Sequence, residues 1–247
     1  MPSSKKSPIA SKAEPPTGSD TALPLLDGTP PTPVKTQRRT QEDRSRDAKE
    51  RLLAATISVL RRKGYNGLTT KEVAKTAGLS NGALVHHYAT KAELVIAATA
   101  AVYDECIIRG QRLARTPQAV KKPIESFISD QLSVYFDWPF HTALEVIVVS
   151  RTDPELMARI YPVMDHYRKT TNALWLEVFK KAGHSPQQAR TILNLSLNMV
   201  RGMAVNRMWA KDETYYDDCL KDWIKIVNEK FPVSKQPSKP ASKPSAA

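Results

Sequence analysis

Residues 69–88, TTKEVAKTAGLSNGALVHHY, constrain the fold most strongly, because they divide into two short helical segments separated by a glycine. Thr69 and Glu72 stand at capping-box spacing and open a first segment that runs barely two turns before Gly78. Ser80 is then placed to cap the second segment. The pattern predicts a helix-turn-helix, whose second helix can present its N-terminal residues to the major groove of DNA.

The neighbouring residues His86 and His87 raise two alternatives, a metal site and a catalytic site. Adjacent residues on a helix point about 100° apart, whereas a shared metal ion needs i, i+3 or i+4 spacing, and no Cys, Asp or Glu stands at a matching position. No acid is placed to orient either histidine for catalysis. We therefore predict no metal ligands, no catalytic residues and no cofactor.

Positive charge is concentrated around this motif. Residues 44–91 carry ten Lys and Arg against three acids, whereas residues 92–229 carry seventeen of each. A local basic excess favours a polyanionic partner such as DNA, although it can also serve only to keep a surface soluble. Two distant cysteines, Cys106 and Cys219, show neither metal nor disulfide spacing, which is typical of a reducing cytosol.

The apolar residues between about Arg44 and Phe231 repeat at helical spacing, without the alternation of strands. We expect an all-α protein, with an N-terminal three-helix helix-turn-helix DNA-binding domain followed by a larger helical-bundle ligand-binding and dimerisation domain. The expected parts are a disordered Pro- and Ser-rich basic tail at 1–43, the DNA-binding domain at 44–91, the helical domain at 92–231 and a disordered tail at 232–247.

Individual helix ends are also predictable. Gly64 should end the first helix after a cationic turn, and Thr90 with Glu93 should form a second capping box that opens a long fourth helix. Further helices are expected near 118–136, 139–151, 154–182, 186–210 and 213–230. The chain has neither a signal-peptide pattern nor an apolar run of membrane length, so we expect a cytoplasmic, nucleoid-associated protein with no membrane partner.

The segment RLLAATISVLRRKGYNGLTTKEVAKTAGLSNGALVHHYATKAEL, residues 51–94, strongly resembles the N-terminal domain of the tetracycline-repressor (TetR) family of bacterial regulators. The resemblance includes the Leu-Leu-x-Ala start, the Gly-Tyr after the first helix, the Thr-Thr cap, Ala-Gly, Ser-x-Gly-x-Leu, His-Tyr and Lys-x-Glu-Leu. It implies a homodimeric regulator, most often a repressor, that binds a double-stranded palindromic operator and responds to a small-molecule effector.

The resemblance also assigns DNA-binding roles. It places phosphate or base contacts at the start of the second helix, a base-facing and backbone-facing surface at the start of the third, and phosphate contacts just beyond. The implied residues are Thr70, Lys71, Ser80, Asn81, Gly82, Ala83, Val85, His86, His87 and Lys91. Lys, Thr and Tyr are common in the family where Asn81, Ala83 and Val85 stand, so polar base readout is expected to rest on Asn81 and Lys71, with apolar contacts to thymine methyl groups from the other two.

Two further elements are less determined by the sequence. The basic segment KTQRRTQEDRSR before the domain either enters an adjacent minor groove or remains a solvated arm. In the second domain the resemblance implies an effector pocket between helices and a dimer seam on residues 186–230. Candidate seam residues are Leu193, Leu197, Val200, Met208, Leu220 and Ile224.

Aromatic and polar side chains of the helical half supply the candidates for the pocket. Aromatic stripes on helices usually form core, and the polar face at Asn194, Asn198 and Arg201 can equally be solvated or part of the seam. The candidate ligand-binding residues are Tyr135, Trp138, His141, Glu145, Trp175, Asn198 and Arg201, with Arg201 suited to an anion and Glu145 to a cation. The effector is expected to be partly apolar.

Two other functions stay open at this point. A DNA-binding structural protein without a metabolite ligand would share the same N-terminal domain and would have a filled helical core. An enzyme in the helical half would need a nucleophile–base pair, paired carboxylates or a phosphate loop, and the sequence offers none of these patterns.

Overall fold

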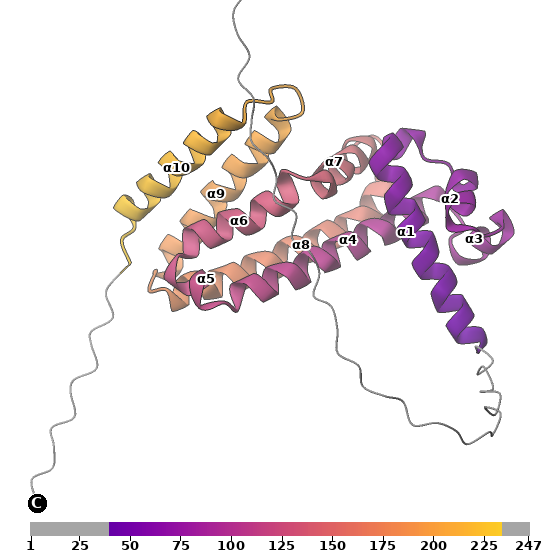
Figure 1. Ribbon diagram of the computed structural model, residues 1–247, viewed down its shortest axis with the longest axis horizontal. Helices are drawn as coiled ribbons and strands as arrows, with labels where there is room; N and C mark the ends of the chain where they lie inside the picture. The colour runs from indigo at the N-terminus through magenta and orange to yellow at the C-terminus, as the bar shows by residue number, and fades with distance from the viewer. Residues whose placement is uncertain (1–39, 234–247) are drawn as a thin grey trace, which may run out of the picture. The chain divides into compact units, whose positions relative to one another are not determined.

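The computed structural model describes residues 40–233, which form ten helices and no strand (Figure 1). The helices are α1 (Gln41–Gly67), α2 (Thr70–Ala77), α3 (Asn81–His87), α4 (Lys91–Ala114), α5 (Pro117–Lys121), α6 (Pro123–Tyr135), α7 (Trp138–Ser150), α8 (Pro154–Lys181), α9 (Pro186–Asn206) and α10 (Glu213–Lys230). The expected all-α class is confirmed. The basic arm as far as Arg39 and the last fourteen residues of the chain, 234–247, lie outside the described residues.

Helix α1 begins at Gln41, before the expected domain boundary at Arg44. Thr40 Oγ1 accepts a hydrogen bond from Asp43 N at 3.1 Å, and Asp43 Oδ2 accepts one from Thr40 N at 3.2 Å. These two bonds form a capping box, which satisfies two backbone N–H groups at the helix start. The sequence analysis did not predict this helix start, because Thr40 and Asp43 directly follow a Pro- and Ser-rich stretch whose composition indicates disorder.

Gly64 marks a kink in α1 rather than its end. Its φ of 67° and ψ of −177° are not helical, yet a further turn follows as far as Gly67. Directly after the kink, Glu145 Oε2 of α7 accepts a hydrogen bond from Tyr65 N at 2.7 Å. The cationic turn and the glycine therefore signalled a real break, but the helix resumes beyond it.

The expected helix over 118–136 is wrong, because the chain forms two helices there, α5 and α6. Pro123 has no N–H to donate and disfavours helical geometry in the residue before it. Lys122 accordingly has φ −132° and ψ 69°.

The two capping boxes expected at Thr69 and Thr90 form only by half. Each threonine accepts from the backbone N–H three residues on, Thr69 from Glu72 N and Thr90 from Glu93 N. The glutamates turn elsewhere: Glu72 Oε2 accepts from Lys63 Nζ at 2.8 Å, and Glu93 Oε2 accepts from Ala89 N at 2.8 Å. Glu72 thus links α2 to α1, and Glu93 links α4 to the turn before it, and neither side chain accepts from the N-cap backbone N–H of its own helix.

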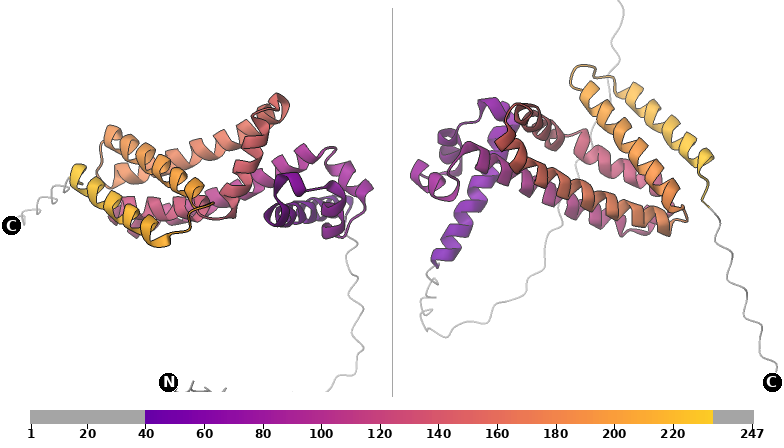
Figure 2. Two further views of the ribbon diagram at one scale, coloured as in Figure 1. Left: turned by 90° about the horizontal axis from the view of Figure 1, so that it is seen from above. Right: turned by 180° about the vertical axis from the view of Figure 1, so that it is seen from behind.

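Helices α2 and α3 lie at one end of the helical array and α9 with α10 at the other, while α4 and α8 run side by side between them (Figures 1 and 2). No helix in the described part of the chain is long and apolar enough to cross a bilayer.

The end formed by α1, α2 and α3 has its own core, which includes the fully buried Leu52, Val59 and Leu84. Two residues of the second half, Val146 of α7 and Ile160 of α8, belong to the same cluster and are exposed by at most 1%. The expected parts at 44–91 and 92–231 therefore share one apolar core at their junction. A change in the packing of α7 or α8 would therefore alter the contacts of the core that supports α2 and α3.

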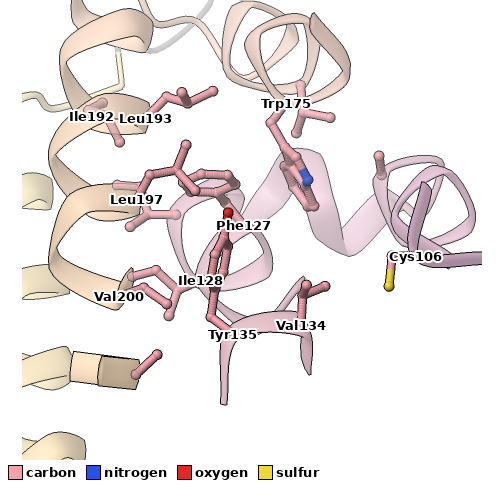
Figure 3. Packing of buried hydrophobic residues seen from close by; sticks show 14 of the residues in the cluster. Cys106, Phe127, Ile128, Val134, Tyr135, Trp175, Ile192, Leu193, Leu197 and Val200 are labelled. Atoms are coloured by element: carbon pink, nitrogen blue, oxygen red, sulfur yellow. The ribbon is translucent and has the colours of Figure 1, made fainter. Parts of the chain in front are cut away.

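The bundle core centres on Phe127 of α6, whose ring lies 5.5 Å from that of Trp175 and 5.6 Å from that of Phe179 (Figure 3). The Trp175 indole N–H donates to Asp130 Oδ2 at 2.7 Å. Burial raises the pKa of this carboxyl above its ordinary value, while the bond from Trp175 acts in the opposite direction. Cys106 is buried in the same core, and Cys219 packs against it.

His184, in the connection between α8 and α9, should make stability depend on pH. The side chain is 3% exposed, neither ring nitrogen has a hydrogen-bond partner among the described residues, and burial lowers its pKa below the ordinary 6.5. As the pH falls below 6.5, the unfolded chain binds a proton that the folded chain resists, so the free energy of unfolding should fall. Denaturant titrations above and below pH 6.5 should show a smaller loss of unfolding free energy at the lower pH in His184→Gln than in the parent protein.

The exposed His166 supplies the matched control, since His166→Gln removes an imidazole that is already in water. This variant should keep the slope of the parent protein. Identical slopes in the parent and in His184→Gln would contradict the assignment of the pH dependence to His184.

Candidate DNA interface

The turn between α2 and α3 is built as the sequence predicts. Gly78 adopts the left-handed conformation, with φ 63° and ψ 37°, which glycine reaches at little cost. Leu79 N then donates to Ala74 O at 3.0 Å, and Ser80 Oγ accepts from Ala83 N at 3.1 Å. The end of α2 and the start of α3 are thus both satisfied locally.

One face of this helix pair is anchored and the other is open. Val73 and Leu84 are fully buried and Ala74 nearly so, which fixes how the two helices cross. Away from this contact on α3, Val85 is 49% exposed and Asn81 is also exposed. The first turn of α3 therefore offers side chains and backbone N–H groups to a partner outside the chain.

Arg51 of α1 is a supporting residue that sequence reasoning missed. Its Nε and Nη2 donate to Ala77 O at 3.1 and 2.6 Å, and Nη2 also donates to Gly78 O at 3.1 Å. The cation neutralises carbonyl groups at the C-terminal end of α2 and holds the turn against α1. The partners lie 26 and 27 residues apart, so no local spacing could have revealed them.

The implied phosphate-binding residues gather around the end of α3. The rings of His86 and His87 lie 5.2 Å apart, and Lys91 Nζ lies 4.4 Å above the ring of Tyr65. Partial burial lowers the pKa of His87, and the charges of His86 and Lys49 lower it further. Partial burial also lowers the pKa of Lys91. Lys49 of α1 therefore adds positive charge beside the recognition helix.

A second basic surface lies at the start of α2. Lys71 and Lys75 line a shallow hollow with Arg62 and Thr69, and Lys71 is exposed. Thr70 is half-buried beside them. Across residues 40–233, no group of three or more His, Cys, Asp or Glu side chains is placed to hold a metal ion.

Comparisons with known proteins identify the family. Residues 52–98 match the model of the bacterial regulatory proteins of the tetR family. The HTH-type transcriptional regulator CymR of Pseudomonas putida is 32% identical over 195 residues, covering 79% of this chain and 96% of the relative. The chain belongs to the TetR family. It is a transcriptional regulator with a helix-turn-helix DNA-binding domain.

Solved structures of regulators share the fold of this TetR-family chain at low sequence identity. A TetR-family regulator from Mesorhizobium loti superposes with a TM-score of 0.58 at 14% identity, covering 77% of this chain and 99% of its own. A transcriptional regulator from Rhodococcus gives 0.56 at 23% identity, covering 76% and 99%. The shared architecture thus extends through the variable helical half.

The seven candidate ligand-binding residues of this TetR-family regulator do not form one site. Arg201 Nε donates to the Tyr135 hydroxyl at 2.9 Å, deep between α6 and α9. Trp175 is fully buried against Asp130. Asn198 lies on the exposed side of α9 in a surface hollow shared with α10. The remaining three, Trp138, His141 and Glu145, lie together elsewhere.

These three residues line a groove between the end of α1 and one face of α7, of about 650 Å³. We call it the α1–α7 groove and define it by Arg61, Trp138, His141, Glu145 and Val148. Glu145 is exposed, and its side chain reaches the kink of α1. By contrast, the hollow between α1, α4 and α7 near Tyr103 holds only about 10 Å³.

Asn81 is expected to discriminate one base pair of the operator. It is the first residue of α3 and exposed, so Asn81→Ala should leave the fold intact. Loss of a bidentate contact should cost about 1–3 kcal/mol at one position of the site. Binding of single-base operator variants, measured by fluorescence anisotropy, would show this as relaxed preference at that position.

The exposed Asn228 of α10 provides a matched substitution far along the chain from the motif. Asn228→Ala should retain the full preference at every position. A preference profile that is the same for Asn81→Ala and Asn228→Ala would contradict the role of Asn81.

His87 should make operator binding depend on pH. In the free protein its pKa is lowered by burial and by neighbouring positive charge, whereas a DNA phosphate beside it would raise that pKa. Proton uptake on binding should then increase operator affinity as the pH falls through about 6.5, the ordinary range of histidine. His87→Gln should show a flatter dependence in parallel titrations, and an equal slope would rule this residue out as the source.

Proposed function

We propose that this TetR-family protein is a ligand-responsive, dimeric transcriptional repressor that binds a palindromic operator. The observation that carries the proposal is the anchored helix pair of the N-terminal domain, with the first turn of α3 open and surrounded by basic side chains. The residues proposed to contact DNA are Thr70, Lys71, Ser80, Asn81, Gly82, Ala83, Val85, His86, His87 and Lys91. Such a domain reads a half-site, so a palindrome requires two copies at a fixed separation.

An exposed face on α9 and α10 supports dimer formation. Leu195 and Ile226 are 50% and 52% exposed, and Met199, Cys219 and Trp223 are partly exposed near them. Within the chain, Trp223 Nε1 donates to Ser196 Oγ at 2.8 Å and so ties α10 to α9. An apolar face at the far end from the DNA-binding domain fits a twofold contact that leaves both reading helices free.

The seam residues proposed from sequence need correction. Leu193, Leu197, Val200 and Leu220 are buried in the core of their own chain, because they point to the inner side of α9 and α10. Only the opposite side of these helices is available to a second copy. Helical spacing separated the two faces of each helix, but it could not predict which face packs into the core of the chain and which stays exposed.

Two observations bear on ligand control in opposite ways. The α1–α7 groove is large enough for a small molecule and touches both α1 of the N-terminal domain and α7 of the bundle. The small hollow near Tyr103 instead favours a second candidate function, a regulator without a metabolite ligand. Operator titrations with and without a panel of small organic anions and cations separate these functions, since unchanged affinity throughout would support the second.

The dimer face can be tested with one substitution. Ile226→Glu places a charge on the proposed contact, where burying it without a partner is costly. Sedimentation equilibrium should show conversion from dimer to monomer, and affinity for the palindromic operator should fall at least about tenfold because the two half-sites are no longer bound together.

Ile108 of α4, which is 41% exposed, offers the same chemical change away from the proposed face. Ile108→Glu should remain dimeric and bind the operator normally. A monomeric parent protein, or an Ile226→Glu variant that stays dimeric, would overturn the proposed arrangement.

A further inference from the structure

The α1–α7 groove contains a cation without a carboxylate partner. The guanidinium of Arg61 lies 5.0 Å from the centre of the Trp138 ring, and within residues 40–233 no carboxylate lies within salt-bridge distance of it. Its neighbours Arg62 and Lys63 differ, since both pair with Glu72, at 3.6 and 2.8 Å. This cation–π contact holds the Arg61 guanidinium beside the indole and leaves its N–H groups available to an anion.

The acidic residue of the groove is already occupied. Glu145 Oε2 accepts from Tyr65 N at 2.7 Å, and the carboxylate lies against Gly64 at the kink of α1. With the indole face of Trp138 covered by Arg61, neither group is free to receive an organic cation. Of the three cationic side chains that line the groove, Arg62 and Lys63 are paired with Glu72, so Arg61 remains to attract an anionic occupant.

A second polar side chain, His141, lines the same groove. Nε2 of His141 is buried and has no hydrogen-bond partner among the described residues. His141 stands between Trp138 and Glu145 at helical spacing, so all three share one face of α7. Neighbouring atoms cover this nitrogen, so a rotation of the His141 side chain is needed before a polar ligand atom can reach it and recover the free energy that an unpaired buried group costs.

The remaining wall of the groove is apolar and open to solvent. Val148 is 58% exposed and Met208 is 50% exposed, and Leu60 and Leu144 also line it. A hydrocarbon chain or ring placed there would remove this surface from water. The groove thus combines an available guanidinium with an apolar wall inside a volume of about 650 Å³.

We propose that the α1–α7 groove binds a small amphipathic carboxylate, whose carboxylate contacts Arg61 and His141 and whose apolar part covers Val148 and Met208. The site touches both sides of the Glu145–Tyr65 joint, so its occupant shifts α7 relative to the kink of α1. Because Val146 of α7 belongs to the core that supports α3, the shift lowers operator affinity. This control of DNA binding rests on the proposed function, whereas the binding site itself does not.

The binding step is tested with the full chain and linear fatty carboxylates from hexanoate to palmitate. Calorimetric titration should show binding that strengthens with chain length over the shorter members, and octylammonium and octanol should bind at least about tenfold more weakly than octanoate. Arg61→Gln should weaken octanoate binding about tenfold or more, as loss of a charge-assisted contact predicts.

Arg62→Gln is the matched control, since it removes the adjacent guanidinium, which is already paired. It should bind octanoate within about twofold of the parent protein. Absence of binding by every carboxylate, equal affinity of Arg61→Gln and the parent, or a preference for octylammonium would each overturn the site.

Operator titration with the same carboxylates tests the regulatory step separately. The expected result is release from DNA in the parent protein and a loss of this response in Arg61→Gln, with equal operator affinity of both proteins when no carboxylate is present. Carboxylate binding without any change in operator affinity would overturn the effector role. A parent protein that binds no specific operator would instead refute the proposed function and leave the binding result standing.

Discussion

The position of the recognition helix depends on the burial of Leu84. Helix α3 has seven residues, too few to be stable in water by itself. Its shape is held by the Ser80 cap, and its direction by the contact of Leu84 with the core that α1, α2 and α4 supply. The surrounding helices thus order the surface that meets DNA before DNA arrives, which lowers the entropy cost of binding.

The same core explains how the two halves of the chain can communicate. Val146 and Ile160 enter the DNA-binding core from α7 and α8, and Arg159 of α8 pairs with Glu93 at 3.2 Å. Glu93 also accepts from Ala89 N, directly after α3. A movement of the bundle would therefore be transmitted to α3 both through apolar packing and through a charged contact.

Local signals predicted the motif well, while contacts between distant residues escaped prediction. The turn at Gly78 and the cap at Ser80 follow from conformational and hydrogen-bonding preferences that a few residues express. The roles of Arg51 and Glu145 depend on partners 26 and 80 residues away, which periodicity cannot reveal. For the same reason the candidate ligand-binding residues lie at separate places in the structure. The sequence indicated the chemistry of each side chain, but it did not predict which helix faces pack together.

The close approach of Glu145 to Gly64 has a consequence for how such a chain can evolve. A β-carbon built on Gly64 would clash with Glu145 Oε2, and the positive φ of this residue is itself unfavourable for other residues. A side chain at this position would displace the Glu145 carboxylate and break its bond to Tyr65 N, and the positive φ would still disfavour the substitution in a chain without the acid. Loss of the glycine should therefore be accompanied by loss of the Glu145 contact, so that joint retention across relatives marks those in which this joint still operates.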